Sequence, residues 1–211
     1  MVLHWCSDAK ELGMSRSPRS DIVDPHSVQM FHCRSRCVRR AFLCGEDHYS
    51  GKNYDHRRQW IEDKQIDLAK YFSLDIVAVS IMSNHMHHVL RTRPDLVRKM
   101  SNKEVARRWL GICPKRRNDD GTACEPTDDE IRDLCKQKNK LKQLRERLSS
   151  ISWFMRVLKQ SIARRANLED EVDGRFWVRP SYCLHSPRLK ELNTLINAVC
   201  TDFASCYQFC V

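Results

Sequence analysis

Two strand-like runs, separated by only two polar residues, constrain this chain more than any other feature of its sequence. Residues 74–82 are β-branched and largely apolar, and residues 85–91 resume the strand-like pattern. A strand at 28–37 and an amphipathic helix at 53–72 precede them. Runs of this length with so short a connection are typical of neighbouring antiparallel strands. The order strand, helix, strand, strand therefore predicts an α+β fold, a ferredoxin-like antiparallel sheet with helices on one face.

The first strand is predicted to have one basic face and one buried face, because successive side chains of a strand point to opposite sides. The basic face is formed by Met30, His32, Arg34 and Arg36. The buried face is formed by Phe31, Cys33 and Cys37. This strand thus combines core formation with a positively charged surface.

Composition divides the chain into three parts. Residues 1–27 contain several Ser and Pro residues and no apolar period, so we expect a poorly ordered arm. Residues 28–177 contain the predicted sheet and helices and form the domain. Residues 178–211 form a tail of different composition, with four of the eleven cysteines at 183–210. An apolar stripe predicts that this tail is helical over 187–210.

The domain is predicted to be helical after its central strands. Residues 101–127 are charged, contain Pro and Gly, and are expected to form an insertion loop with one short helix. Two helices follow within 128–167. One covers 128–149 and begins with a capping-box sequence, and the other covers 151–167. The expected fold therefore has a helical insertion and C-terminal helices in addition to its sheet.

Charge favours a polyanionic partner. Lys and Arg number 37 against 27 Asp and Glu, which gives a formal charge of +10. Nucleic acid is the first partner class that this balance suggests, and a merely basic soluble surface is the alternative. No apolar run approaches the ~20 residues of a membrane-spanning helix, and the N-terminus lacks an apolar signal-peptide core. We therefore expect a cytoplasmic protein with no membrane partner.

The cysteines suggest a zinc site as a second possibility. The chain has 11 of them, an odd number without a secretion signal, which favours reduced thiols over disulfides. Cys33, Cys37, Cys44 and His48 have a spacing that resembles a zinc-ligand string. On a strand, however, Cys33 and Cys37 would lie roughly 13 Å apart, too far to share one ion.

The most informative side chains are His85 and His87. Their i, i+2 spacing on a strand places both imidazoles on one face, about 6.5 to 7 Å apart at the backbone. At that separation both rings can reach one divalent ion. Met86 and His88 are expected to point the other way. The alternative is a pair of surface histidines on an edge strand.

Several blocks of sequence, in order, resemble the single-tyrosine HUH transposases of the insertion-sequence-200-like and REP-associated branch. The resemblance covers roughly residues 28 to 177. Its blocks are Phe31–Gly45, Val79–Leu90, Ile151–Arg156 and Gly174–Trp177. It implies a ferredoxin-like sheet, a homodimer, and single-stranded or hairpin DNA as the substrate.

The resemblance also implies a chemistry. His85 and His87 would be the metal-binding pair, with Mg²⁺ or Mn²⁺ as the divalent metal. The metal polarises the scissile phosphate while a tyrosine hydroxyl attacks phosphorus, which cuts and rejoins DNA through a 5′-phosphotyrosine. The side chains expected to contact DNA are His32, Arg34, Arg36, Arg39, Arg40, Arg164 and Arg165.

The tail departs from the pattern of these transposases. They carry the nucleophile on a later helix as Tyr-x-x-x-Asn, and the later helices and the tail of this chain contain no such motif. Tyr207, on the predicted tail helix, and Tyr182, in a predicted loop, are the candidate nucleophiles. The alternative for Tyr207 is a core tyrosine, because Val211, four residues further on, cannot serve as a metal ligand. The alternative function is that of a DNA-binding protein that has lost the tyrosine and no longer cuts. A replaced or frameshifted tail would explain the departure.

Overall fold

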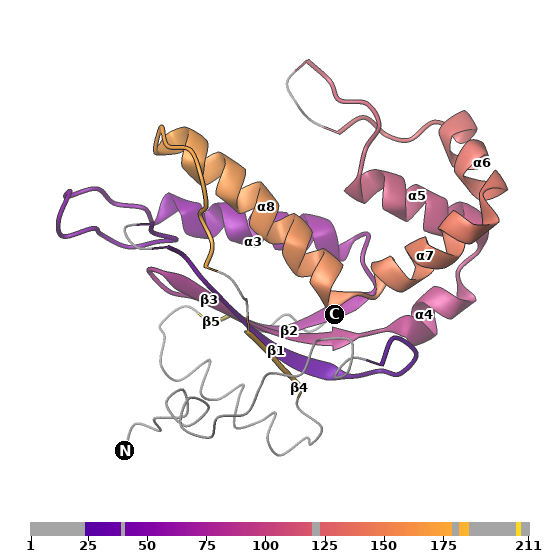
Figure 1. Cartoon of the computed structure of the whole chain (residues 1–211), viewed down its shortest axis with the longest axis horizontal. Helices are drawn as coiled ribbons and strands as arrows, with labels where there is room; N and C mark the ends of the chain where they lie inside the picture. Colours follow the sequence, from indigo (N-terminus) through magenta and orange to yellow (C-terminus); the bar gives the residue numbers. More distant parts are fainter. Residues whose placement is uncertain (1–23, 39–40, 120–122, 179–181, 186–205, 208–211) are drawn as a thin grey trace.

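A five-stranded antiparallel sheet forms the centre of the molecule (Figure 1). The computed structural model describes residues 24–38, 41–119, 123–178, 182–185 and 206–207. The spatial order of the strands is β4-β1-β3-β2-β5. The strands are β1 (Met30–Arg36), β2 (Leu74–Ile81), β3 (His85–Thr92), β4 (Tyr182–His185) and β5 (Cys206–Tyr207). The three strands predicted from the sequence are thus confirmed.

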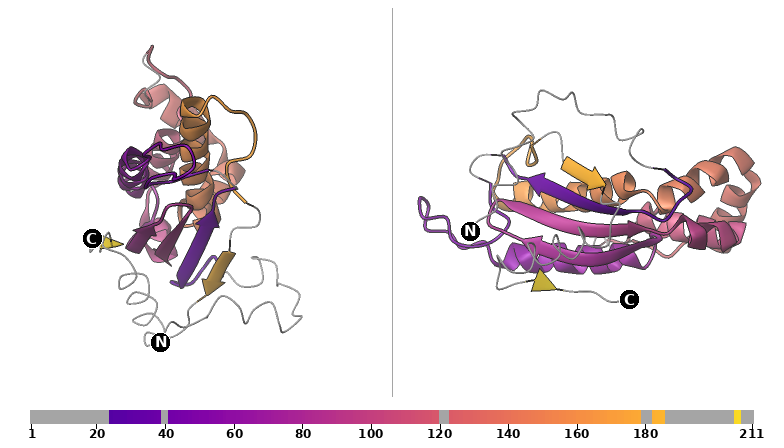
Figure 2. Two further views of the ribbon diagram at one scale, coloured as in Figure 1. Left: turned by 90° about the vertical axis from the view of Figure 1, so that its left-hand side faces the viewer. Right: turned by 90° about the horizontal axis from the view of Figure 1, so that it is seen from below.

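Helices α3 (His56–Ala69) and α8 (Ile151–Glu169) lie side by side on one face of this sheet (Figure 1, Figure 2). The chain order β1, α3, β2, β3, α8, β4, with the spatial order β4-β1-β3-β2, is that of a ferredoxin-like fold. The predicted α+β class is therefore confirmed. β5 adds a short strand at the outer edge of β2.

The core fills the space between the sheet and these two helices. β1 contributes Phe31 and Cys33, which are both buried. α8 contributes Phe154, Leu158 and Ile162, spaced by four residues along one side of the helix. This is the apolar stripe that the sequence predicts for the last helix. The alternation of buried and exposed side chains along β1 is also as predicted.

α3 buries a charged residue that an apolar pattern cannot reveal. The Arg57 side chain is fully buried and forms ion pairs with Glu169 and Asp170 at the end of α8. It also donates a hydrogen bond to the Phe42 carbonyl oxygen at 2.9 Å. A buried guanidinium needs such partners, because an unpaired charge in the core is strongly destabilising. Arg57 thus ties the start of α3 to the end of α8.

Four helices form the insertion between β3 and α8. They are α4 (Pro94–Lys99), α5 (Asn102–Ile112), α6 (Asp128–Lys136) and α7 (Lys138–Leu148). α5 corresponds to the predicted short helix. α4 was not predicted, although Pro94 at its first position is a typical helix start. Every helix of the described residues is too short or too polar to cross a lipid bilayer.

The single helix predicted over 128–149 is wrong, because the chain bends at Gln137. The backbone of Gln137 has φ −92° and ψ 76°, which lies outside the helical region. The bend lets the apolar sides of α6 and α7 both pack on α5. The predicted start is correct, since Thr127 and Glu130 form the capping box.

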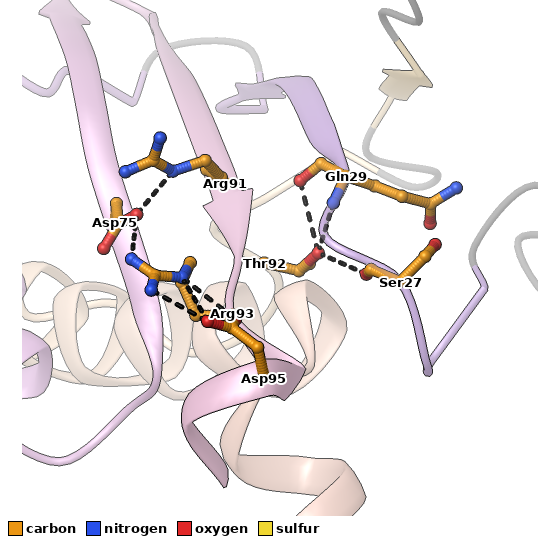
Figure 3. Close-up of polar contacts among 7 residues, drawn as sticks. All are labelled: Ser27, Gln29, Asp75, Arg91, Thr92, Arg93 and Asp95. Atoms are coloured by element: carbon orange, nitrogen blue, oxygen red, sulfur yellow. Dashed lines mark hydrogen bonds and ion pairs between the residues drawn. The ribbon is translucent and has the colours of Figure 1, made fainter. Parts of the chain in front are cut away.

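Polar contacts fix the ends of the central strands (Figure 3). Asp75 on β2 accepts a hydrogen bond from Arg91 on β3 at 2.5 Å and also pairs with Arg93. On the other side of β3, the backbone N–H of Gln29 donates to the Thr92 hydroxyl at 2.9 Å. These contacts hold the register at the end of the sheet farthest from His85.

Two short segments of the tail, β4 and β5, are strands. β4 pairs with β1 and places Tyr182 in the sheet, not in a loop. β5 pairs with β2, so the helix predicted over 187–210 does not include Cys206 and Tyr207. Residues 186–205, and residues 1–23 of the predicted arm, lie outside the described residues.

Candidate functional site

The predicted site residues of the central strands lie on the face of the sheet opposite α3 and α8. We call this the histidine face. Among the described residues no helix covers it (Figure 1, Figure 2). Its members alternate with the core residues of the three central strands. They are Met30, His32, Arg34, Arg36, Ala78, Ser80, His85, His87, Val89 and Arg91.

The structure places His85 and His87 as the sequence predicts. Their ring centroids are 5.1 Å apart on the same face of β3, with the ring planes at 69°. Met86 and His88 point into the core on the other side and are fully buried. In the register of β1 and β3, Arg36 lies opposite His85 and Arg34 lies opposite His87. The two imidazoles thus stand beside two arginines.

Asn84 fixes the protonation pattern of His85. The His85 Nδ1 lies 2.7 Å from the side-chain oxygen of Asn84. Because an amide oxygen only accepts hydrogen bonds, the proton of His85 is on Nδ1. Its Nε2 therefore carries a lone pair, which is the form that binds a metal ion.

His32 contacts His87 directly. The His32 Nε2 lies 2.7 Å from the His87 Nδ1. The ring planes differ by only 15° and the centroids are 4.9 Å apart, so the two rings are nearly coplanar and meet edge to edge at this hydrogen bond. His32 lies opposite Val89, so it is a diagonal neighbour of His87, within reach of an aromatic side chain. The sequence resemblance implies only a DNA contact for His32, and the spacing within one strand does not reveal this pairing.

All three histidines on this face favour the neutral form. Burial is the main reason that the pKa of His87 is lowered to about 3, and His32, His85 and Arg34 add to the effect. Burial, with Arg34 and Arg36, lowers the pKa of His85 to about 4. The pKa of His32 is lowered by burial and by Arg34. Neutral imidazole is the form required for metal coordination, so the pair is ready to bind a cation at neutral pH.

His85 and His87 fit a divalent ion as two nitrogen ligands. Nitrogens that share one ion lie no more than about 4 Å apart, which a ring separation of 5.1 Å allows. In the described part of the chain, no group of three or more His, Cys, Asp or Glu residues is arranged to hold a metal. No described carboxylate therefore completes the pair. Mg²⁺ prefers oxygen ligands, so this donor set suits Mn²⁺ or a later transition ion better.

Positive charge is concentrated at the His85 end of the histidine face. Arg36 is exposed and makes no ion pair with the described residues, and Arg34 is half-buried beside it. At the opposite end, the charge of Arg91 is balanced by Asp75 at 2.5 Å. An anion approaching this face therefore meets the strongest attraction next to the two histidines.

The other arginines expected to bind DNA are not part of this cluster. Arg164 and Arg165 are exposed on α8, on the helical side of the sheet. Arg165 lies 3.9 Å over the ring of Trp60 on α3. Arg39 and Arg40 lie outside the described residues.

The strand register places the two candidate tyrosines differently. Tyr182 on β4 is paired with Arg34, which is paired with His87, so all three share one cross-strand row. Tyr207 on β5 is paired with Val79, in the neighbouring row. The backbone of Tyr182 is thus in register with the histidine pair, and that of Tyr207 is one residue out of register.

The zinc alternative does not fit the structure. Cys33, Cys37 and Cys44 are buried thiols in the core, and they do not form a metal-binding group with His48 or any other described residue. Burial raises the pKa of the Cys37 thiol to about 12, which disfavours the thiolate that zinc requires. The spacing that suggested zinc is therefore coincidental.

Comparisons with known proteins give one result of note. No known protein family matches the sequence, and no curated protein matches it. A solved structure of a REP-associated tyrosine transposase bound to a REP hairpin is similar in fold, with 10% sequence identity and a TM-score of 0.46. The alignment covers 88% of this chain and 70% of that one. Similarity at this level assigns neither a family nor an activity.

Proposed function

We propose that this protein binds single-stranded or hairpin DNA on its histidine face, and cuts and rejoins it by metal-assisted transesterification through a 5′-phosphotyrosine. The observation that carries the proposal is the pair of neutral imidazoles, His85 and His87, next to Arg34 and Arg36. The sequence resemblance to HUH transposases described above supplies the reaction type.

Electrostatics support a nucleic-acid backbone as the ligand. A chain with a formal charge of +10 gains affinity for DNA by releasing counterions from the phosphates. Arg34 and Arg36 provide guanidinium groups, which suit phosphate oxygens well. Because these arginines are on the central strand β1, a phosphate bound there lies next to the histidines.

The reaction needs a cation and a nucleophile. A divalent ion bound by His85 and His87 would polarise the scissile phosphate. The oxygen of a tyrosine hydroxyl forms a bond to phosphorus while the bond from phosphorus to the 3′ oxygen breaks, and that oxygen takes up the proton. Attack by a 3′ hydroxyl reverses the step. Tyr207 and Tyr182 are the candidates from the sequence, and the register of β4 favours Tyr182.

The covalent intermediate provides the test. DNA hairpins labelled at the 3′ end should yield a labelled protein band on a denaturing gel with Mn²⁺, because the 5′-phosphate of the 3′ fragment stays on the tyrosine. His87→Ala should abolish the band, and His48→Ala, a change at an exposed histidine, should not. Tyr182→Phe and Tyr207→Phe identify the nucleophile. A band that persists in His87→Ala would contradict the proposed role of the pair.

A DNA-binding protein that does not cut is the second candidate. The absence of a Tyr-x-x-x-Asn motif from the later helices and the tail, and the register of Tyr207, favour it. It predicts salt-sensitive binding of structured single strands with no covalent band under any divalent metal. A band with the full chain would exclude it. For either function we propose a homodimer, which sedimentation at micromolar concentration tests directly.

A further inference from the structure

His85 and His87 differ in what fixes their protons. The partner of His85 is the Asn84 oxygen, which can only accept, so the tautomer of His85 is set. The partner of His87 is the imidazole of His32, whose Nε2 can either donate or accept. Which nitrogen of His87 carries the proton therefore depends on which nitrogen of His32 carries its proton.

Only one arrangement of this imidazole pair leaves His87 able to bind a cation. If His87 donates from Nδ1 to the Nε2 of His32, the Nε2 of His87 carries a lone pair. If His32 donates instead, the single proton of His87 is on Nε2, and that nitrogen has no lone pair with which to bind a metal. In the first arrangement His32 carries its own proton on Nδ1.

We infer that His32 is a positioning residue: its Nε2 accepts the Nδ1 proton of His87 and holds that ring so that Nε2 faces outward as a ligand. This inference rests on the proposed metal site. The hydrogen bond is 2.7 Å long and the two ring planes differ by only 15°, so the N–H of one ring points along the lone pair of the other and the orientation of the His87 ring is restrained. β1 lies between β4 and β3, and β3 lies between β1 and β2, so the backbones that carry the rings are held by paired strands on both sides.

His32 acts through His87 and not as a third ligand. Its Nε2 is already occupied by the Nδ1 of His87, and the described residues contain no three-residue metal group. A hydrogen-bond acceptor behind a coordinating histidine raises the basicity of the ligand and fixes its orientation. Losing such a partner weakens metal affinity about 10- to 100-fold.

Three variants separate the hydrogen bond from the mere presence of an aromatic ring at position 32. His32→Phe keeps an aromatic ring but removes the acceptor, and it should weaken Mn²⁺ binding about 10- to 100-fold in calorimetry. His32→Gln restores an accepting oxygen and should recover part of the affinity. His48→Phe, at an exposed histidine in the loop between β1 and α3, should bind as the wild type does.

The tautomer is measured independently in the metal-free wild-type protein. Long-range proton–nitrogen NMR spectra of ¹⁵N-histidine-labelled protein should show the His87 proton on Nδ1. A proton on Nε2 would overturn the inference. Equal Mn²⁺ affinity of the wild type and His32→Phe would also overturn it and leave the proposed metal site intact. A wild-type chain that binds no divalent ion would refute the metal site, and the inference with it.

Discussion

At the scale of single residues, buried polar groups distinguish this sheet from an ordinary apolar one. His88 is fully buried on the core side of β3, next in sequence to His87. Its Nε2 lies 3.2 Å from the side-chain oxygen of Gln65 on α3. Burial lowers the pKa of His88 to about 4. A neutral histidine in the core makes the stability of the fold depend on pH.

His88 should therefore make the protein less stable in mild acid. Between pH 6.5 and 4 the unfolded chain binds a proton at this residue and the folded chain does not, so stability falls as the pH falls. From pH 7 to pH 5 the loss due to His88 is about 1 to 2 kcal/mol, measurable by urea unfolding. His88→Gln should reduce this dependence. An unchanged difference between the two pH values in that variant would contradict the assignment.

At the scale of elements, one glycine allows α5 to approach the end of α3. A Cβ atom added at Gly111 would lie 2.2 Å from Cε1 of Tyr71, with two more ring atoms within 3 Å. Tyr71 follows α3, and its ring packs against the core. Gly111 is thus required by close packing, although glycine is a poor helix former.

Gly111→Ala should destabilise the protein despite the better helix propensity of alanine. Alanine gains roughly 1 kcal/mol in a helix, but overpacking the Tyr71 ring costs about 1 to 3 kcal/mol. In a Tyr71→Ala background the clash is absent, so the same change should stabilise the protein. Denaturant unfolding of the four proteins of this double-mutant cycle measures the difference. A stabilising effect of Gly111→Ala in the wild type would refute the close contact.

The elements that the sequence predicts well are those whose apolar residues recur at regular spacing. β1, β2 and β3 follow from alternation and β-branched runs, and α8 follows from its apolar stripe. The break at Gln137 was missed because the apolar positions on both sides fit one continuous helix, and only packing on α5 requires two. β4 and β5 were missed because the strands are very short and depend on pairing with distant residues.

At the site too, the sequence predicts what local spacing determines and misses what depends on contacts between distant residues. The i, i+2 spacing of His85 and His87 determines that they share a face, because strand side chains alternate. The His32 contact depends on the register between β1 and β3, which the spacing within one strand does not specify. Asn84 could have been noticed, since an amide directly before the first histidine is within reach of its ring.

At the scale of the whole molecule, a net positive charge attracts DNA most strongly where nearby carboxylates do not neutralise it. The balanced pair of Arg91 and Asp75 at one end of the histidine face contrasts with Arg36 at the other. DNA bound at this face should therefore depend on Arg36 more than on exposed arginines elsewhere. Arg132 on α6, which is paired with Asp129, is a matched comparison.

Arg36→Ala should weaken the binding of single-stranded DNA and flatten its salt dependence. Loss of one phosphate contact lowers the slope of log K against log salt concentration by about 0.7. Arg132→Ala should leave the slope unchanged. Fluorescence anisotropy titrations at several salt concentrations measure both slopes. Identical slopes for the wild type and Arg36→Ala would indicate that DNA does not contact this face.

A cation bound by His85 and His87 is the central requirement of the proposed function. Titration of the full chain with Mn²⁺, followed by electron paramagnetic resonance of the free ion, counts the bound ions and measures their affinity. We predict one tight Mn²⁺ per chain in the wild type, its loss in His85→Ala and His87→Ala, and its retention in His48→Ala. Equal Mn²⁺ binding by the wild type and His87→Ala, or no binding by either, would contradict the central claim.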